Sequence, residues 1–294
     1  MNYYIENDKL IVRIDSFGAE VKSVLSKSNY REYMWYGNPT FWGRTSPVLF
    51  PFVGSVKNKK YKWDGVEYAM GQHGFARDME FELCEKSNDK IAFILKSDAE
   101  TLKKYPFSFE LIITYTLVDT ELNVNWTVKN AGDNTMYFSI GAHPAFLCPV
   151  HGENTKEGYK LFFENVDEIK HHGNELDSGL AKMDENISLP LSNHRATITK
   201  GFFDRCTYYV EGNQTGLVGL EDSDGKRIVD VIFDTPLFAI WSPEGKNAPF
   251  ICIEPWYGRA DATDFDGDLS ERAYTNILDT KETFNGGYGI RFYL

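Results

Sequence analysis

Apolar and polar residues alternate one by one along much of this chain, and this pattern constrains its fold more than any other feature. In Leu122–Lys129 every second residue is apolar, and Met79–Cys84 shows the same period. Successive side chains of a β-strand point to opposite faces, so the period predicts strands with one buried and one solvated face. The same criteria predict further strands at Leu10–Ile14, Ile91–Lys96, Phe107–Leu117, Met136–Ile140, Ala196–Thr199, Ile228–Phe233, Phe238–Trp241, Phe250–Glu254 and Gly287–Tyr293.

Turn residues and one short helix separate these strands. Asp64-Gly65, between two short alternating runs, predicts a tight β-hairpin, and Asp224-Gly225 predicts a second turn. Ser97–Glu100 resembles a capping box, which predicts a helix of about two turns that ends before Pro106. The polar stretch Pro149–Leu176 is expected to hold a long loop, and such loops are often functional.

The many short strands and the lack of long helical periodicity predict an all-β fold. Turns at intervals of about 8 to 12 residues are typical of a large antiparallel sandwich or barrel. Hydrophobic residues make up 42% of the 294 residues, which is enough for a substantial core. No composition shift, linker or internal repeat divides the chain, so residues 1–294 are expected to form a single β-sandwich domain.

Charge and apolar content exclude several classes of partner. The chain has 31 basic and 43 acidic residues and a formal net charge of −12, whereas nucleic-acid binding needs a basic surface. Met1–Asp8 lacks the regions of a secretory signal, and no apolar run approaches the roughly 18 residues of a membrane span. We therefore expect a cytoplasmic protein with no nucleic-acid or membrane partner, either a monomer or a homodimer.

Several sequence motifs of catalysis and metal binding are missing. There is no G-x-S-x-G elbow, no Walker loop and no G-x-G-x-x-G after a strand. The cysteines contain no closely spaced pair, and each has apolar or aromatic neighbours, so we expect buried free thiols at Cys84, Cys148, Cys206 and Cys252. His171-His172 falls in the predicted polar loop and is expected at the surface.

Two histidines stand among Gly, Pro and aromatic residues near probable strand ends. His73 lies between Gln72 and Gly74, where small residues let a ligand approach the backbone, and Arg77 follows as a cation. His143 precedes a proline that stops ladder pairing, so its ring is expected at a sheet rim. With a pKa near neutrality, it is a natural proton donor to a sugar oxygen. The structural alternatives are a histidine in a turn and one that caps a strand end.

Glu254 has a similar setting at the end of an apolar strand, before Pro255-Trp256. Partial desolvation would raise its pKa towards the range of a general base, and Trp256 offers a flat face to a sugar ring. A solvated rim glutamate is the alternative. Arg44 and Asp204 also have aromatic neighbours and would be either ligand contacts or ion-pair partners.

A metal site is a further alternative for these ionisable residues. His73, His143 and Glu254 have the residue types of a two-histidine, one-carboxylate site. No two of them belong to one local motif, and nothing in the sequence selects a metal. We therefore expect neither a metal nor another cofactor.

Five motifs in order carry a resemblance to a known family. They are Arg44 with Pro47–Pro51, His73–Arg77, Gly141–Pro144, Asp204-Arg205, and Glu254–Trp256 with Gly258. With them the chain resembles the aldose 1-epimerase (mutarotase) superfamily over nearly its whole length. It is most similar to the bacterial LacX-type branch and, more distantly, to glucose-6-phosphate 1-epimerases. The resemblance implies a β-supersandwich of two large antiparallel sheets.

The resemblance also implies roles for individual residues of this chain. His143 matches the general acid and Glu254 the general base of sugar-ring opening. Substrate-binding positions match His73, Arg44 and Asp204, with Gln72, Arg77 and Trp256 alongside. The implied substrate is a small-molecule sugar or sugar phosphate, since basic residues near the Arg77 position hold the phosphate in sugar-phosphate relatives. A non-catalytic sugar-binding or sugar-sensing protein on the same fold is the alternative.

Overall fold

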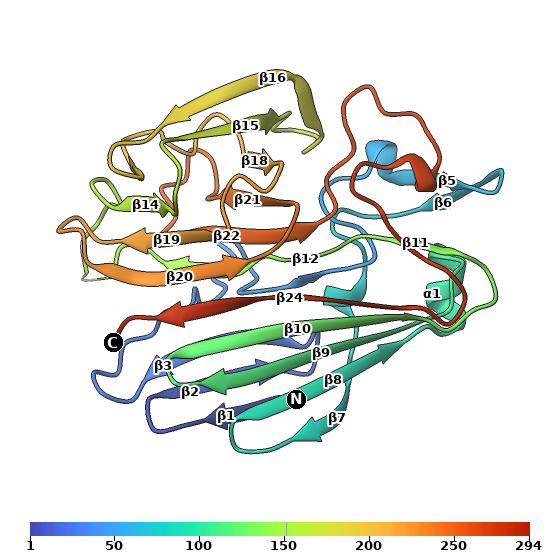
Figure 1. Ribbon diagram of the computed structural model, residues 1–294, viewed down its shortest axis with the longest axis horizontal. Helices are drawn as coiled ribbons and strands as arrows, with labels where there is room; N and C mark the ends of the chain where they lie inside the picture. The colour runs from blue at the N-terminus through green and yellow to red at the C-terminus, as the bar shows by residue number, and fades with distance from the viewer. Residues whose placement is uncertain (151) are drawn as a thin grey trace.

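The structure is a computed structural model that describes residues 1–150 and 152–294, and two large antiparallel sheets dominate it (Figure 1). The nine-stranded sheet has the order β17 (Arg195–Thr197), β14 (Lys160–Phe163), β19 (Leu217–Glu221), β20 (Arg227–Phe233), β24 (Thr283–Phe292), β10 (Glu121–Asn130), β9 (Phe109–Val118), β8 (Lys90–Lys96) and β7 (Glu82–Lys86). The eight-stranded sheet has the order β16 (Ala181–Pro190), β15 (Glu168–Asn174), β18 (Tyr208–Glu211), β21 (Leu237–Trp241), β22 (Phe250–Tyr257), β12 (Ile140–Ala142) and β4 (Val48–Leu49), with β13 (Ala145–Leu147) also paired to β22. The fold is all-β, as predicted.

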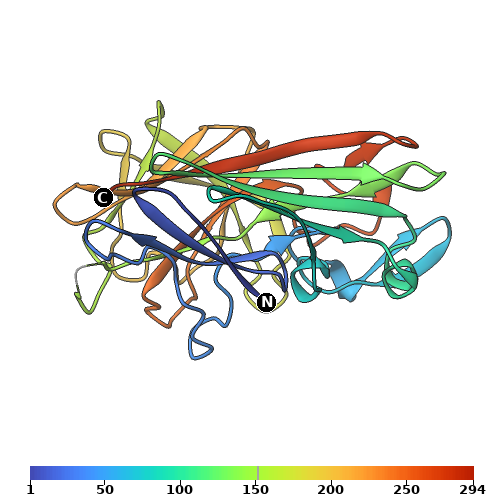
Figure 2. The same cartoon turned by 90° about the horizontal axis from the view of Figure 1, so that it is seen from below.

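Smaller elements flank the two large sheets. A three-stranded sheet contains β1 (Asn2–Glu6), β2 (Leu10–Asp15) and β3 (Glu20–Ser26), and two-stranded pairs join β5 (Lys60–Trp63) to β6 (Val66–Ala69) and β11 (Met136–Phe138) to β23 (Asn276–Leu278). The helices are α1 (Ala99–Lys104) and the 3-10 turns η1 (Lys57–Lys59), η2 (Ala76–Asp78) and η3 (Leu269–Glu271). The three-stranded sheet lies against β8 and β9, where Tyr3 packs edge-on against Phe93 (Figure 2).

The predicted alternation explains how the strands bury one face. In β10, Leu122, Val124 and Trp126 are buried, while the residues between them are at least partly exposed. Trp126 stands opposite Ile113 of β9, so the apolar faces of neighbouring strands coincide. These residues belong to one core cluster that also contains residues of the eight-stranded sheet, and this shared core holds the two large sheets together.

Strand β22 differs because both of its faces are buried. Ile251 and Ile253 point into the core that the two sheets share. By the period of two, Cys252 and Glu254 point to the other face, where Cys252 packs in a separate small cluster. This strand therefore presents a carboxyl group to the sheet face that carries the cavity described below.

The structure confirms most of the predicted strands, with ends shifted by a few residues. It also confirms the hairpin and the short helix. Asp64-Gly65 joins β5 to β6 as a tight hairpin. The short helix is α1, but its N-cap is Asp98 and its capping box closes through Thr101, not through Ser97 and Glu100 as predicted. Asp98 is the N-cap because its carboxylate accepts hydrogen bonds from the backbone N–H groups of both Glu100 and Thr101.

Other predictions about strands and loops were wrong. Met79–Cys84 is not one half-buried strand: β7 begins at Glu82, and Leu83 is 41% exposed, because β7 is a bulged edge strand. Met136–Ile140 divides at Ser139 into β11 and β12, which pair in different sheets. The predicted loop Pro149–Leu176 contains strands β14 and β15, and its residue 151 lies outside the described residues.

Burial corrects two further expectations. His171 is not at the surface: it lies on β15, is 3% exposed and packs on Tyr208 with ring centroids 4.4 Å apart. Cys84 is an exposed thiol on β7, whereas the other three cysteines are buried and free as expected. In the part of the chain that the structure describes, no helix is long and apolar enough to cross a membrane.

Candidate active site

A cavity of about 310 Å³ opens beside strands β15, β18, β21 and β22 of the eight-stranded sheet. This volume falls within the range of about 300–1,000 Å³ typical of small-molecule sites. The lining is mainly polar and ionisable, with aromatic rings of Trp42, Tyr209, Trp241 and Trp256 between the polar groups. Such a mixture of hydrogen-bonding groups and flat rings suits a molecule with many hydroxyl groups and apolar C–H faces.

Glu254 lies at the floor of this cavity, on β22. Its side chain is 1% exposed, and burial raises the pKa of its carboxyl group well above the ordinary value, with a smaller opposing effect from Trp256. The sequence predicted partial desolvation, and the observed burial is nearly complete. An empty site therefore favours the protonated carboxyl group.

His143 lies between β12 and β13 in the sequence, and its imidazole contacts two indole rings. The ring stacks on Trp42 with centroids 4.5 Å apart and meets Trp241 edge-on at 5.4 Å. Burial, and to a smaller degree the cation of Arg77, lowers the pKa of His143 to about 3. The imidazole is therefore neutral in the empty site at neutral pH.

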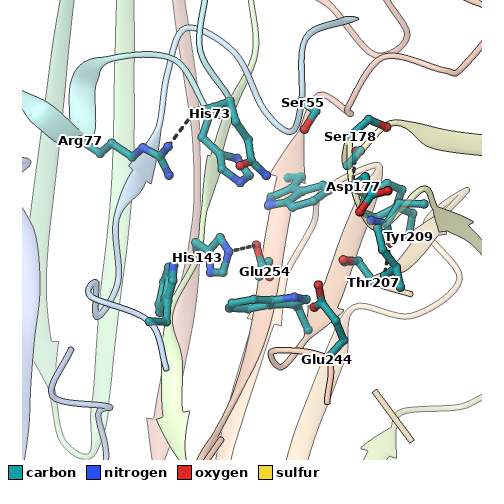
Figure 3. Close-up of a pocket in the computed structure, with 17 residues that line it drawn as sticks. Ser55, His73, Arg77, His143, Asp177, Ser178, Thr207, Tyr209, Glu244 and Glu254 are labelled. Atoms are coloured by element: carbon teal, nitrogen blue, oxygen red, sulfur yellow. Dashed lines mark hydrogen bonds and ion pairs between the residues drawn. The ribbon is translucent and has the colours of Figure 1, made fainter. Parts of the chain in front are cut away.

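His143 and Glu254 form a close pair. Nε2 of His143 lies 3.2 Å from Oε2 of Glu254 (Figure 3). The two atoms are within ion-pair distance but are not aligned as a regular hydrogen bond, and Oε2 of Glu254 and Nδ1 of His143 have no hydrogen-bond partner within the described residues. Buried polar atoms are normally paired, so these atoms are available to a bound molecule.

Burial shifts the pKa values of the two groups in opposite directions. It favours a protonated carboxyl group at Glu254 and a neutral ring at His143. Because Nε2 of His143 and Oε2 of Glu254 are 3.2 Å apart, the charge on one group affects the protonation of the other.

His73 has a different electrostatic role because of its hydrogen bond to the backbone. Its Nδ1 accepts the N–H of Gly54 at 3.1 Å, so the ring proton must reside on Nε2. Burial lowers its pKa well below the ordinary value, with a smaller effect of Arg77. A neutral ring with a fixed Nε2–H is a hydrogen-bond donor, not a proton shuttle.

The local backbone explains why glycine follows His73. His73 has a positive φ of 65° and Gly74 one of 69°. A Cβ atom on Gly74 would clash with the carbonyl group of Phe50. The Gly74 position therefore requires glycine, and the turn brings the imidazole of His73 beside that of His143, with ring centroids 5.6 Å apart.

Arg77 and Gln72 complete this side of the cavity. Arg77 lies on η2, and its Nη2 donates to the backbone carbonyl of Gln72 at 2.7 Å. Burial, and to a smaller degree Arg44, lowers the pKa of Arg77 to about 10, and its Nε has no hydrogen-bond partner among the described residues. Figure 3 shows Arg77 and Glu244 at opposite ends of the set of lining residues.

The structure brings six of the eight predicted site residues to this cavity: Gln72, His73, Arg77, His143, Glu254 and Trp256. Arg44 does not line it, and its Nη2 binds Asp78 Oδ1 at 2.7 Å. Asp204 does not line it either, because its Oδ1 accepts the backbone N–H of Gly245 at 3.0 Å beside a second cavity. Both residues have partners within the protein, and Arg44 lines a neighbouring cavity together with Trp42 and Arg77.

Sequence reasoning missed several polar residues of the cavity. They are Ser55, Asn174, Asp177, Ser178, Thr207, Tyr209 and Glu244. Asn174, Asp177 and Ser178 come from one segment at the end of β15, and the others come from separate parts of the chain. Trp42 carried a signal, since it precedes Gly43-Arg44 in the aromatic segment that drew attention to Arg44.

One group of side chains has the spacing of metal ligands within the described residues. Ligand atoms of His143, Cys252 and Glu254 lie within 4.8 Å of one another. The set contains Cys252 and lacks His73, which the sequence had grouped with His143 and Glu254. Burial raises the pKa of the Cys252 thiol well above its ordinary value.

Comparison with known proteins indicates the family of this chain. A sequence model of the aldose 1-epimerase family matches residues 1–268. The chromosomal LacX protein of Lactococcus lactis subsp. lactis is 28% identical over 297 residues, which cover 99% of each chain. Both findings agree with the resemblance that the five motifs indicated.

Solved structures share the fold over the full length. A galactose mutarotase related enzyme from Lactobacillus acidophilus has a TM-score of 0.94 and 36% identity, and the match covers 100% of this chain and 98% of that one. A galactose mutarotase-like protein from Lactobacillus casei ATCC 334 has a TM-score of 0.92 and 29% identity, with 100% of both chains covered. The chain belongs to the aldose 1-epimerase family.

Proposed function

We propose that this protein is an aldose 1-epimerase that interconverts the α and β anomers of a free hexose by general acid–base ring opening. The observation that carries the proposal is the buried His143–Glu254 pair, which faces the cavity with Nε2 of His143 3.2 Å from Oε2 of Glu254. General acid and general base catalysis each contribute about 10²- to 10⁴-fold. Because mutarotation proceeds slowly in water without a catalyst, two positioned groups suffice for a useful enzyme.

The proposed reaction begins when the proton of Glu254 is on His143, so that Glu254 is a carboxylate and His143 an imidazolium. Glu254 removes the proton of the anomeric hydroxyl group while His143 gives its proton to the ring oxygen. The bond between C1 and the ring oxygen breaks, and C1 becomes an aldehyde carbonyl. After rotation about C1–C2, the hydroxyl group formed from the ring oxygen attacks the other face of the carbonyl. His143 takes back the proton of this hydroxyl group, and Glu254 returns its proton to the anomeric oxygen. The proton count of the pair is unchanged.

The neighbouring residues support this chemistry. The neutral His73 ring offers its Nε2–H to a sugar oxygen. Arg77 offers its Nε, which lies 3.9 Å from Asp78 Oδ2 but has no hydrogen-bond partner among the described residues. The stacked Trp42 fixes the plane of the His143 ring, and Trp256 offers an apolar face to the sugar. Water is largely excluded from the pair, which strengthens the electrostatic interactions of the transition state.

The charges around the cavity favour a free sugar over a sugar phosphate. Asp177 and Glu244 place two carboxylates on the lining, and Arg77 is its single arginine or lysine within the described residues. The guanidinium of Arg77 is already bound to Gln72, and Arg44 is paired with Asp78 outside the lining. A phosphate dianion in this cavity would be near one cation, which is already hydrogen-bonded to Gln72, and near two carboxylates that repel it.

A panel of anomer-exchange rates tests the proposal. Exchange would be measured by NMR for glucose, galactose and their 6-phosphates, each against the rate in buffer alone. We expect strong acceleration for at least one free hexose and weaker acceleration for its 6-phosphate. Sugar binding without any acceleration would support the non-catalytic alternative, and a preference for the 6-phosphates would contradict the argument from charge.

We also propose that the protein works in the cytoplasm. All four cysteines are free thiols, and Cys84 is exposed. Free thiols persist where reductants keep them reduced. Cell fractionation with a tagged full-length chain would test this, and recovery with an extracellular or membrane fraction would contradict it.

A further inference from the structure

Lys156 is a buried ammonium group without a salt bridge to any described residue. The residue is 6% exposed, and burial lowers the pKa of its amine to about 8. Its Nζ donates to Ser242 Oγ, to the Ala248 carbonyl at 2.7 Å and to the Phe250 carbonyl at 3.4 Å. An ammonium has three donors, and here three acceptors receive them, which offsets the cost of burial.

All three acceptors lie on one connection of the chain. Ser242 begins the segment between β21 and β22, and Phe250 ends it. The hydrogen bonds of the Lys156 amine therefore join the two ends of the segment 242–250. Within this segment Glu244 faces the candidate active site, while Ser242 and Ala248 are buried.

A second residue holds the same segment from another side. Asp204 Oδ1 accepts the backbone N–H of Gly245, next to Glu244. The preceding residue, Phe203, has its ring 5.0 Å from Nζ of Lys156. Lys156 and Asp204 both line the second cavity, of about 260 Å³, and neither lines the cavity that contains His143 and Glu254.

We propose that Lys156, with Asp204, is a positioning residue for sugar binding, which holds residues 242–250 so that the Glu244 carboxylate accepts a hydrogen bond from a sugar hydroxyl group. The inference rests on the proposed function and deepens it. It also gives Asp204 a role: the residue acts on the substrate through the backbone next to Glu244. Because Lys156 and Asp204 do not line this cavity and Glu244 is not one of the two groups that transfer protons, we expect the effect on binding more than on the chemical step.

A double-mutant cycle between Lys156 and Glu244 tests the proposal. Lys156→Met and Glu244→Gln should each raise KM and the Kd for the sugar about 3- to 10-fold, the effect of one ordinary hydrogen bond, with kcat within about twofold of wild type. The double variant should be no weaker than the weaker single variant, because both changes remove one interaction. Increases that multiply in the double variant would show that Lys156 acts independently of Glu244 and would overturn the proposal.

Two further variants separate positioning from general loss of structure. Lys200→Met removes an exposed lysine of the same second cavity and should leave KM and Kd unchanged. Asp204→Ala removes the exposed anchor of Gly245 and should reproduce the rise in KM with little loss of thermal stability, even if Lys156→Met folds poorly. An unchanged KM in Asp204→Ala would count against the proposal.

The binding measurement keeps this test distinct from that of the proposed function. Kd would be followed by the fluorescence of the lining residues Trp42, Trp241 and Trp256. If wild-type protein binds the sugar but does not exchange its anomers, the enzymatic proposal fails, and the Kd values still decide whether Lys156 and Glu244 are coupled.

Discussion

The two histidines of the site should respond very differently to substitution, although their rings lie 5.6 Å apart. His73→Asn is the sharpest perturbation. Asparagine tolerates the positive φ of 65° at this position, and its side-chain oxygen can accept the N–H of Gly54 in place of Nδ1. The variant therefore keeps the turn but loses the Nε2–H that would donate to the sugar.

The structure sets the size of the expected effect. A single neutral hydrogen bond contributes about 0.5–1.5 kcal/mol, which corresponds to about 2- to 13-fold. Loss of a general acid costs about 10²- to 10⁴-fold. Among the described residues His73 has no carboxylate within ion-pair distance, whereas His143 has Glu254 at 3.2 Å. We therefore expect His73→Asn to lower kcat/KM by about 3- to 10-fold, mostly through KM, and His143→Asn to lower kcat by at least about 100-fold.

NMR exchange spectroscopy at several sugar concentrations would separate kcat from KM for both variants. The matched pair has the same chemical change at two neighbouring rings, so differences in size or polarity cancel. A loss of about 100-fold or more in kcat for His73→Asn, with KM unchanged, would refute the assignment of His73 as a binding residue and would make it a candidate acid.

Three further predictions address the proton, the turn and the charge of the cavity. The anomer-exchange rate should fall at low pH with an apparent pKa near 3. Below this pH both His143 and Glu254 carry a proton, so neither can act as a base. A fall in the rate centred at pH 6.5 would contradict this. Gly74→Ala should lower the free energy of unfolding by about 2 kcal/mol or more in urea titrations, since φ is 69° and the new methyl group meets the Phe50 carbonyl; wild-type stability would contradict the clash. Asp177→Asn and Glu244→Gln should each narrow the preference for a free hexose over its 6-phosphate by about 3- to 10-fold in competition assays, and an unchanged ratio would show that these charges do not select the substrate.

Features with a local cause were predictable from the sequence. The apolar run before Glu254 predicted a strand at Phe250–Glu254, and the structure has β22 there, extended to Tyr257. The Asp64-Gly65 hairpin depends only on the turn residues and the runs beside them. The family resemblance, carried by ordered motifs, indicated which histidines and which glutamate to consider together.

Features that depend on distant partners were not predictable. Arg44 is paired with Asp78, 34 residues away, and Asp204 binds the backbone of Gly245, 41 residues away. No local pattern distinguishes such partners from a ligand. The burial of His171 likewise depends on Tyr208 of the neighbouring strand β18.

The polar lining of the cavity shows the same limit. Asp177, Thr207 and Glu244 come together because β15, β18 and β21 are neighbours in the eight-stranded sheet, although they are far apart in the sequence. That strand order follows from long-range pairing, which periodicity does not reveal. Only the sheet topology places these loop residues on one site.

The most direct test of the central claim is the anomer-exchange rate of Glu254→Gln, measured with a free hexose that the wild-type protein accelerates. Glutamine has nearly the shape of glutamate but removes no proton, so the sugar should still bind within about threefold of the wild-type Kd. We predict that kcat falls by at least about 100-fold, because the base is lost. Exchange at the full wild-type rate would show that the His143–Glu254 pair is not the catalyst.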